Sequence, residues 1–184
     1  MYGLAEFIKD LEDITSSTEN QNQIVKKAKS ALKRLLNSKN FSPVLNKELS
    51  DNSRYLRYLV YEDPNKRFYI FSMLWPPNNE SPIHDHNGTW GIEGVYEGRL
   101  RVKNFIKLLD KDKLKLKILS QFVLNQHEIA DLTSKLNIHK IENLDNKSIS
   151  IHVYGEKLMK MNIYNKLNNN DEYLMEEKAL SVDN

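Results

Sequence analysis

Pro82-Ile-His-Asp-His-Asn-Gly-Thr-Trp-Gly91 is the stretch of this chain that carries the most chemical information. In an extended strand, alternate side chains point to the same side, so His84 and His86 would face the same way. Two imidazoles at this spacing suit a single metal ion. Gly98, which follows Tyr96-Glu97, predicts a hairpin turn that closes two antiparallel strands.

Short runs rich in β-branched and aromatic residues surround this stretch. They cover residues 54–61, 67–75, 90–96, 100–106, 116–122, 138–142, 148–154 and 159–164. Turn sequences such as Asp63-Pro-Asn65 and Pro76-Pro-Asn-Asn79 separate them, and no helix-length insertion lies between them. The pattern predicts a mainly β protein, either an all-β barrel or a double-sheet jelly roll.

The first part of the chain is helical by periodicity. Apolar residues recur at helical spacing from Leu4 to Ile14 and again from Ile24 to Leu36, which predicts two amphipathic α-helices. Phe41-Ser-Pro43 then marks a stop. We expect one domain over residues 1–184: a helical segment at 1–40, a barrel at 53–164, and a loosely held tail at 168–184 with at most one short helix.

Composition excludes several classes of protein. The 184 residues are close to one domain's length, and the 27 Lys and Arg are interspersed with 25 Asp and Glu, which argues against nucleic acid as a partner. With no cysteine, thiolate zinc sites, iron–sulfur clusters and cysteine nucleophiles are excluded, and His, Asp and Glu remain as strong metal ligands. No apolar run reaches the length of a membrane span and the start lacks a secretory pattern, so we expect a soluble, cytoplasmic protein.

Two further histidines differ in their surroundings. His139 lies in a strand-like segment that begins at Leu136, and we expect it across the barrel from the first pair. His127, within Asn125-Gln-His-Glu128, reads as a loop residue. A His-x-His pair taken alone is more often exposed and without a metal, so the assignment depends on the wider pattern.

That wider pattern resembles the cupin superfamily. Residues 82–98 resemble its first motif, and residues 136–143 resemble the segment that supplies a third histidine. A typical metallo-cupin adds a glutamate five residues after the second histidine, and here that position is Gly91. Glu93 could also face the barrel as a neighbour on the same strand, but the spacing to Gly98 favours Gly91 as the equivalent.

Within the cupins, three histidines without the acid are typical of thiol dioxygenases. The chain resembles the cysteine dioxygenase family, in its bacterial type, over roughly residues 53–164. Tyr55-Leu-Arg57 matches the family's Tyr-x-Arg element, Ser150-Ile-His-Val-Tyr154 matches its Ser-x-His-x-Tyr element, and His139-Lys-Ile-Glu-Asn143 matches the stretch around the third ligand.

The resemblance implies an iron(II) site and a substrate site. His84, His86 and His139 would ligate iron, and Arg57 with Tyr55 would bind the substrate carboxylate. An inward guanidinium in an apolar run needs a buried anion to offset its desolvation, which agrees with that role. The alternative for Arg57 is a solvent-facing position on an alternating strand.

Ser150, His152 and Tyr154 fall two residues apart, so they share one face of a strand and could form a chain of hydrogen bonds. The family implies that Tyr154 is the catalytic phenol and that His152 and Ser150 orient it. A serine hydrolase is disfavoured because the chain has no Gly-x-Ser-x-Gly turn. Some family members join this tyrosine to a cysteine at the Gly91 position, and without cysteine Tyr154 must be a free phenol.

We therefore expect an iron(II)-dependent enzyme that oxidises L-cysteine with O₂ to cysteine sulfinic acid. One alternative is the same reaction on 3-mercaptopropionate, because residues 67–75 and 82–91 resemble the bacterial branch, although its enzymes for that thiol usually carry glutamine at the position of Arg57. Another is a non-catalytic cupin that binds a small carboxylate. Isomerases and decarboxylases that use manganese, zinc or nickel generally keep the acidic ligand. The oligomeric state stays open.

Overall fold

The structure is a computed structural model, and it describes residues 1–43, 54–110, 113–132, 138–167 and 172–183. Leu136, where the expected third-histidine segment begins, and residues 168–171 of the expected tail lie outside the described residues.

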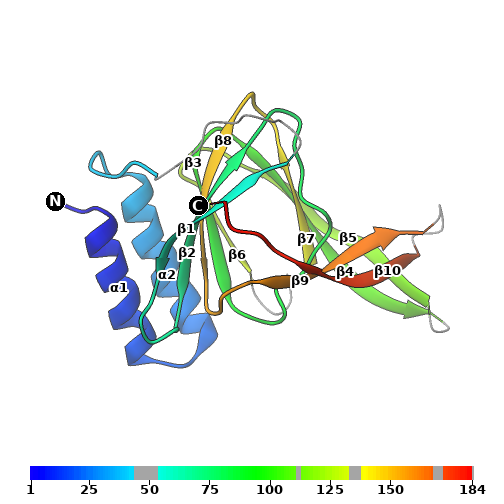
Figure 1. The fold of residues 1–184 in the computed structure, drawn as a ribbon, viewed down its shortest axis with the longest axis horizontal. Helices are drawn as coiled ribbons and strands as arrows, with labels where there is room; N and C mark the ends of the chain where they lie inside the picture. The colour runs from blue at the N-terminus through cyan, green and yellow to red at the C-terminus, as the bar shows by residue number, and fades with distance from the viewer. Residues whose placement is uncertain (44–53, 111–112, 133–137, 168–171, 184) are drawn as a thin grey trace.

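In the described residues two helices precede ten strands (Figure 1). The helices are α1 (Leu4–Ser17) and α2 (Gln21–Leu36), and the strands are β1 (Leu56–Glu62), β2 (Tyr69–Trp75), β3 (Gly91–Glu97), β4 (Leu100–Asp110), β5 (Lys113–Leu124), β6 (Ile129–Leu132), β7 (Ile138–Asn143), β8 (Ser148–Tyr154), β9 (Lys160–Lys166) and β10 (Tyr173–Ala179). The expected fold class, mainly β behind two N-terminal helices, is confirmed.

The strands form antiparallel sheets that face one another around a barrel interior. One sheet has the order β1-β2-β8-β3-β6, a second has the order β5-β4-β7, and β9 pairs with β10. The segment around His84 bridges β7 on one side and β9 on the other. The outer parts of the β4–β5 and β9–β10 ribbons project away from the barrel, and this explains why β4 and β5 run beyond their expected ends (Figure 1).

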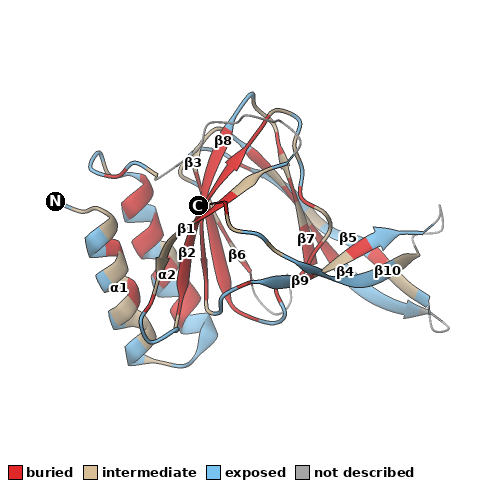
Figure 2. Cartoon of the chain, in the orientation of Figure 1, coloured by how far each residue is buried: buried red, intermediate tan, exposed pale blue. Residues whose placement is uncertain are grey.

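Strand alternation gives the five-stranded sheet two buried faces (Figure 2). Its outer face packs Ile70, Ile92 and Val153 against the apolar stripe of α1 and α2. Full burial of such a side chain stabilises the fold by about 1.5–3 kcal/mol. The inner face therefore points into the barrel, and it carries Ser150, His152 and Tyr154.

The turn at Gly98 corrects one expectation. Its φ of +80° suits glycine, and a Cβ there would lie 2.2 Å from Ser148 Oγ. However, β3 and β4 belong to different sheets. The turn is thus a corner between sheets and not a hairpin, because strand pairing is decided by partners elsewhere in the chain.

The expectation of a loose tail is wrong. β10 pairs with β9 along its whole length, from Tyr173 opposite Lys166 to Ala179 opposite Lys160. Beyond it, Asp183 N donates to Arg57 O at 2.7 Å. Exposed polar composition concealed this strand, since its stability comes from backbone pairing. The four-residue β6 was also not expected.

Candidate metal centre

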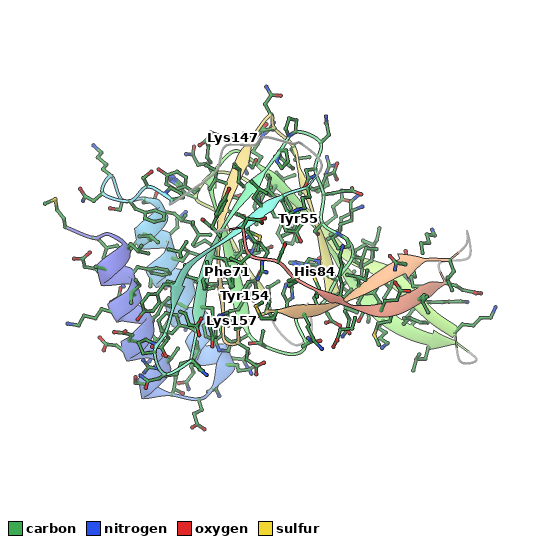
Figure 3. The ribbon with its side chains drawn as sticks, in the orientation of Figure 1. Tyr55, Phe71, His84, Lys147, Tyr154 and Lys157 are labelled. Carbon is green, nitrogen blue, oxygen red and sulfur yellow. The ribbon has the colours of Figure 1, made fainter. Side chains whose placement is uncertain are left out.

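The three expected histidine ligands come together inside the barrel. His84 and His139 exchange two backbone hydrogen bonds of 2.9 Å, so His139 lies beside His84 and not across the barrel as expected. The three rings have centroids 4.6 to 4.9 Å apart, and one nitrogen from each lies within 4.8 Å of the others. All three are buried, and Figure 3 labels His84 within the barrel.

Asp85 explains how the short His-x-His segment directs both imidazoles inward. Its carboxylate accepts hydrogen bonds from Tyr164 Oη at 2.7 Å and from Asn162 Nδ2 at 3.1 Å. These contacts hold the middle residue toward β9. His84 and His86, on the opposite side of the extended segment, therefore face the barrel interior.

The imidazoles of His84 and His139 are held neutral near pH 7, as metal ligands must be. Burial lowers the pKa of His84 to about 4, and burial followed by the neighbouring histidines holds the pKa of His139 well below its usual value. His84 Nδ1 donates to Pro82 O at 3.0 Å, which leaves its Nε2 lone pair facing His139 Nε2 at 3.2 Å. This donor set fits a divalent transition-metal ion and leaves coordination positions open.

Gly91 has no side chain to offer as a ligand, and the aromatic ring of Tyr154 occupies the space that a side chain would take. A Cβ built there would lie 2.8 Å from Tyr154 Cδ1. Among the described residues, His84, His86 and His139 alone converge as a possible metal-binding group. The group thus consists of three histidines without the fourth, acidic residue of a typical metallo-cupin, as expected.

Glu93 faces the barrel interior, as its place on the strand allowed, but the sequence did not indicate its neighbours. It is 2% exposed, with Oε1 3.9 Å from His139 Nδ1 and Oε2 3.7 Å from His152 Nδ1. Burial raises the pKa of its carboxyl group to about 8. The available signal was a charged residue on the same face of a strand as Gly91.

Ser150, His152 and Tyr154 form the expected line on β8. Ser150 Oγ lies 2.7 Å from His152 Nε2, and His152 Nδ1 lies 3.0 Å from Tyr154 Oη. Trp75 Nε1 donates to Ser150 Oγ at 2.9 Å, a contact that the sequence did not indicate. If Ser150 donates its hydroxyl proton to His152 Nε2, His152 Nδ1 can donate to the oxygen of Tyr154. The phenol proton of Tyr154 is then left to donate to a group in the cavity.

Arg57 lies on the wall of the same cavity as His84, His86 and Tyr154. Its guanidinium donates to Leu158 O at 3.1 Å and to Ser181 O at 3.2 Å, and it stacks 4.3 Å from the Phe71 ring centroid. Burial lowers the pKa of Arg57. In the described part of the chain its side chain forms no salt bridge with a carboxylate.

Tyr55 stands two residues before Arg57 and lines the cavity with it. Its ring packs on Trp75 with centroids 4.6 Å apart. The inner cavity, next to the histidines, has a volume of about 20 Å³, and it adjoins an outer cavity of about 230 Å³. Both are lined by Tyr55, Arg57, Met161 and Leu180, so the C-terminal segment forms part of the entrance.

His127 lies outside the cluster, as expected. It sits in an exposed turn with a φ of 67°, and its Nδ1 contacts Asn37 Oδ1 at 3.1 Å. Among the described helices, none is both long enough and apolar enough to cross a membrane.

A family model described as cysteine dioxygenase type I matches residues 2–167. This chain belongs to that family. The match includes the three histidines, the Tyr55 and Arg57 pair, and the line on β8. The family resemblance expected from those motifs is confirmed.

Curated relatives are cysteine dioxygenases type 1. The zebrafish (Danio rerio) protein is 28% identical over 107 residues, which cover 57% of this chain and 53% of that protein. The human (Homo sapiens) protein is 26% identical over 107 residues, which cover 57% of this chain and 52% of that protein. The chain thus spans about half the length of the curated relatives that it matches.

Solved structures with a similar arrangement of strands include cupins. The Schizosaccharomyces pombe Cnp3 cupin domain has a TM-score of 0.47 at 11% identity, covering 65% of this chain and 70% of that one. An oxalate oxidase in complex with the substrate analogue glycolate has a TM-score of 0.46 at 19% identity, covering 63% of this chain and 59% of that one.

Proposed function

We propose that this chain is an iron(II)-dependent thiol dioxygenase that oxidises L-cysteine to cysteine sulfinic acid with O₂. One observation carries the proposal: the buried guanidinium of Arg57 shares a cavity with the imidazoles of His84 and His86 and with the Tyr154 phenol. A site that binds a small thiol carboxylate needs a metal ion to bind the thiolate and a cationic side chain to bind the carboxylate. Its family relatives carry the name of this activity.

Arg57 would bind the substrate carboxylate. The two hydrogen-bond acceptors of its guanidinium in the described part of the chain are neutral carbonyls, so this cation forms no salt bridge there. A buried charge of this kind is costly without one. A carboxylate can take a bidentate pair of charge-assisted hydrogen bonds from a guanidinium, which fixes the direction of the bound thiol.

The reaction adds both atoms of O₂ to sulfur, so a thiol becomes a sulfinic acid and no second reductant is consumed. Bound iron(II) would favour the thiolate form and bring it next to dioxygen. Tyr154 directs its phenol proton into the cavity, where it can donate to the carboxylate or to oxygen as negative charge develops there. His152 and Ser150 hold the phenol in that direction.

The partners in this proposal are a small thiol carboxylate and O₂. A cytoplasmic location, expected from the sequence, stays a prediction. 3-Mercaptopropionate presents the same carboxylate, and Arg57 favours cysteine over it because cysteine can use its amine and sulfur at the metal and leave the carboxylate for the arginine.

An oxygen-electrode assay of the iron-loaded protein tests the proposal with L-cysteine, 3-mercaptopropionate and cysteamine, which has no carboxylate. L-cysteine should have the highest kcat/KM and cysteamine a far lower one. Arg57→Gln should lower kcat/KM for cysteine tenfold or somewhat more, since a charge-assisted hydrogen bond contributes about 1.5–3 kcal/mol.

The matched control is Arg99→Gln, which removes an exposed arginine paired with Asp145 and should leave the kinetics unchanged. A wide preference for 3-mercaptopropionate would overturn the substrate assignment. Binding of cysteine without oxygen consumption would instead indicate a non-catalytic carboxylate-binding protein.

A further inference from the structure

Glu93 is a buried carboxyl group that the proposed reaction does not use. It projects from β3 into the barrel, directly opposite His152 of β8. Neither of its carboxyl oxygens has a hydrogen-bond partner among the described residues, although the side chain is almost fully buried. An acidic group in such a place is disfavoured by desolvation, so its position calls for a partner that it meets in the working protein.

Two imidazole nitrogens lie near this carboxyl group, and only one of them is available. His152 Nδ1 already contacts Tyr154 Oη, and its Nε2 contacts Ser150 Oγ. His139 Nδ1, in contrast, is buried and has no hydrogen-bond partner in the described part of the chain. The nitrogen that can donate to Glu93 is therefore Nδ1 of His139, a residue that we expect to bind the metal through its other ring nitrogen.

His84 shows what this arrangement does for an imidazole. Its Nδ1 proton is held by Pro82 O, and that contact leaves Nε2 unprotonated and turned toward the centre of the cluster. His139 also presents Nε2 to the centre, 3.2 Å from Nε2 of His84. No backbone carbonyl among the described residues holds its Nδ1, and the group that faces this nitrogen is Glu93.

We propose that Glu93 is a positioning residue for the metal centre: its carboxyl group accepts the Nδ1 proton of His139 and so keeps the Nε2 lone pair of that ring directed at the ion. Metal-bound histidines usually donate their second N–H to a carboxylate or carbonyl in this way. The present separation of 3.9 Å exceeds a hydrogen bond by about 1 Å, which a small rotation of the Glu93 side chain closes.

This inference rests on the proposed function through its metal site alone, because thiol and dioxygen play no part in it. Metal affinity is therefore the readout, measured by competition with a chelator using Co(II) and, without air, Fe(II). Glu93→Leu should weaken the affinity by about 10- to 100-fold and change the Co(II) absorption spectrum. Glu93→Gln, whose amide oxygen still accepts a proton, should stay within about threefold of wild type.

Glu97→Leu is the matched control, since it makes the same change at the more exposed end of the same strand and should leave metal affinity unchanged. The melting temperature of metal-free Glu93→Leu should not be lower than that of the metal-free wild-type protein, because the substitution removes a buried carboxyl group without a partner.

Wild-type metal affinity in Glu93→Leu would overturn the proposal. A loss in Glu93→Gln as large as in Glu93→Leu would overturn the hydrogen-bond assignment. If the protein binds metal as expected but oxidises no thiol, the proposed function fails and the role of Glu93 stands.

Discussion

At the scale of single residues, β8 shows how this protein tolerates polar groups in its interior. Ile151 and Val153 pack against the helices, and the polar side chains face the barrel, so both sets are buried. A buried polar group is costly unless it is hydrogen-bonded, and Ser150, His152 and Tyr154 meet this condition by bonding to one another. The line is therefore in place before substrate arrives, which is the condition for efficient electrostatic stabilisation.

Tyr154→Phe tests the phenol at the end of this line. Because it removes one positioned donor, we expect kcat to fall on the order of a hundredfold, equivalent to about 3 kcal/mol, while iron content stays at the wild-type level. Steady-state oxygen consumption and metal analysis measure the two quantities. Tyr61→Phe, which removes a hydroxyl bonded to Glu12 on the surface, is the control. An unchanged rate would reduce the line on β8 to a structural feature.

The pH dependence of stability tests the burial of His152. Burial lowers the pKa of His152 to about 3, whereas in the unfolded chain it titrates near 6.5. Below pH 6.5 the unfolded state thus binds more protons, and this contribution to stability is present in full above pH 6.5 and declines as pH falls toward 3.

We expect the free energy of unfolding of the metal-free wild-type protein, relative to His152→Asn, to fall by about 2 kcal/mol between pH 6.5 and pH 5. Denaturant unfolding at a series of pH values measures it. A difference between the two proteins that does not change with pH would contradict the burial of a neutral imidazole.

At the scale of elements, the C-terminal segment completes the edge of the barrel. β1 is an edge strand, and Asp183 N donates to Arg57 O of this strand, whereas Leu180 N donates to Met159 O. Asp183 accepts from Arg57 N at 2.9 Å and forms an ion pair with Arg54, while Ser181 O accepts from the Arg57 guanidinium. Leu180 adds an apolar contact near Tyr154. Figure 1 shows this segment passing in front of the barrel. The segment therefore positions Arg57 and narrows the cavity.

Asp183→Ala tests this arrangement. Loss of a buried carboxylate that binds two groups should release the end of the segment from β1, so KM for cysteine should rise about tenfold with a smaller change in kcat. Hydrogen exchange at residues 180–183 should become faster in the variant. Asp131→Ala, which breaks the distant ion pair with Lys29, serves as the control. Unchanged KM and unchanged exchange would show that the segment has no such role.

At the scale of the whole molecule, the metal site joins separate parts of the fold. His84 and His86 come from the segment after β2, whereas His139 belongs to β7 in the second sheet. An ion bound by all three would link these parts in the folded state only. Binding that is confined to the native state stabilises it by mass action.

Metal removal should therefore lower thermal stability. With Fe(II) at about 100 times its Kd, binding contributes about 2.7 kcal/mol, and this corresponds to a Tm higher by roughly 5–10 °C than in the presence of a chelator. Calorimetry without air measures the shift. His86→Ala should abolish the shift, and His127→Ala should retain it. A metal-dependent shift that persists in His86→Ala would contradict the assignment of the ligands.

The sequence by itself determined which side chains share a face. The period of two in strands placed His84 with His86, and the three polar residues of β8, on common faces, because side-chain direction in a strand is a local property of the backbone. Ser148–Tyr154 was predicted with its observed bounds. The cupin spacing also predicted that Gly91 supplies no metal ligand.

Only the tertiary structure decided which strands become neighbours and how deeply each group is buried. His84 and His139 are 55 residues apart in the chain, and Arg57 and Asp183 are 126 apart. Such contacts depend on closure of the whole barrel, and no local periodicity reports them. For the same reason the sequence left Glu93 as an inward-facing candidate without a partner, and it mistook a paired terminal strand for a tail, since backbone hydrogen bonds form regardless of polar side chains.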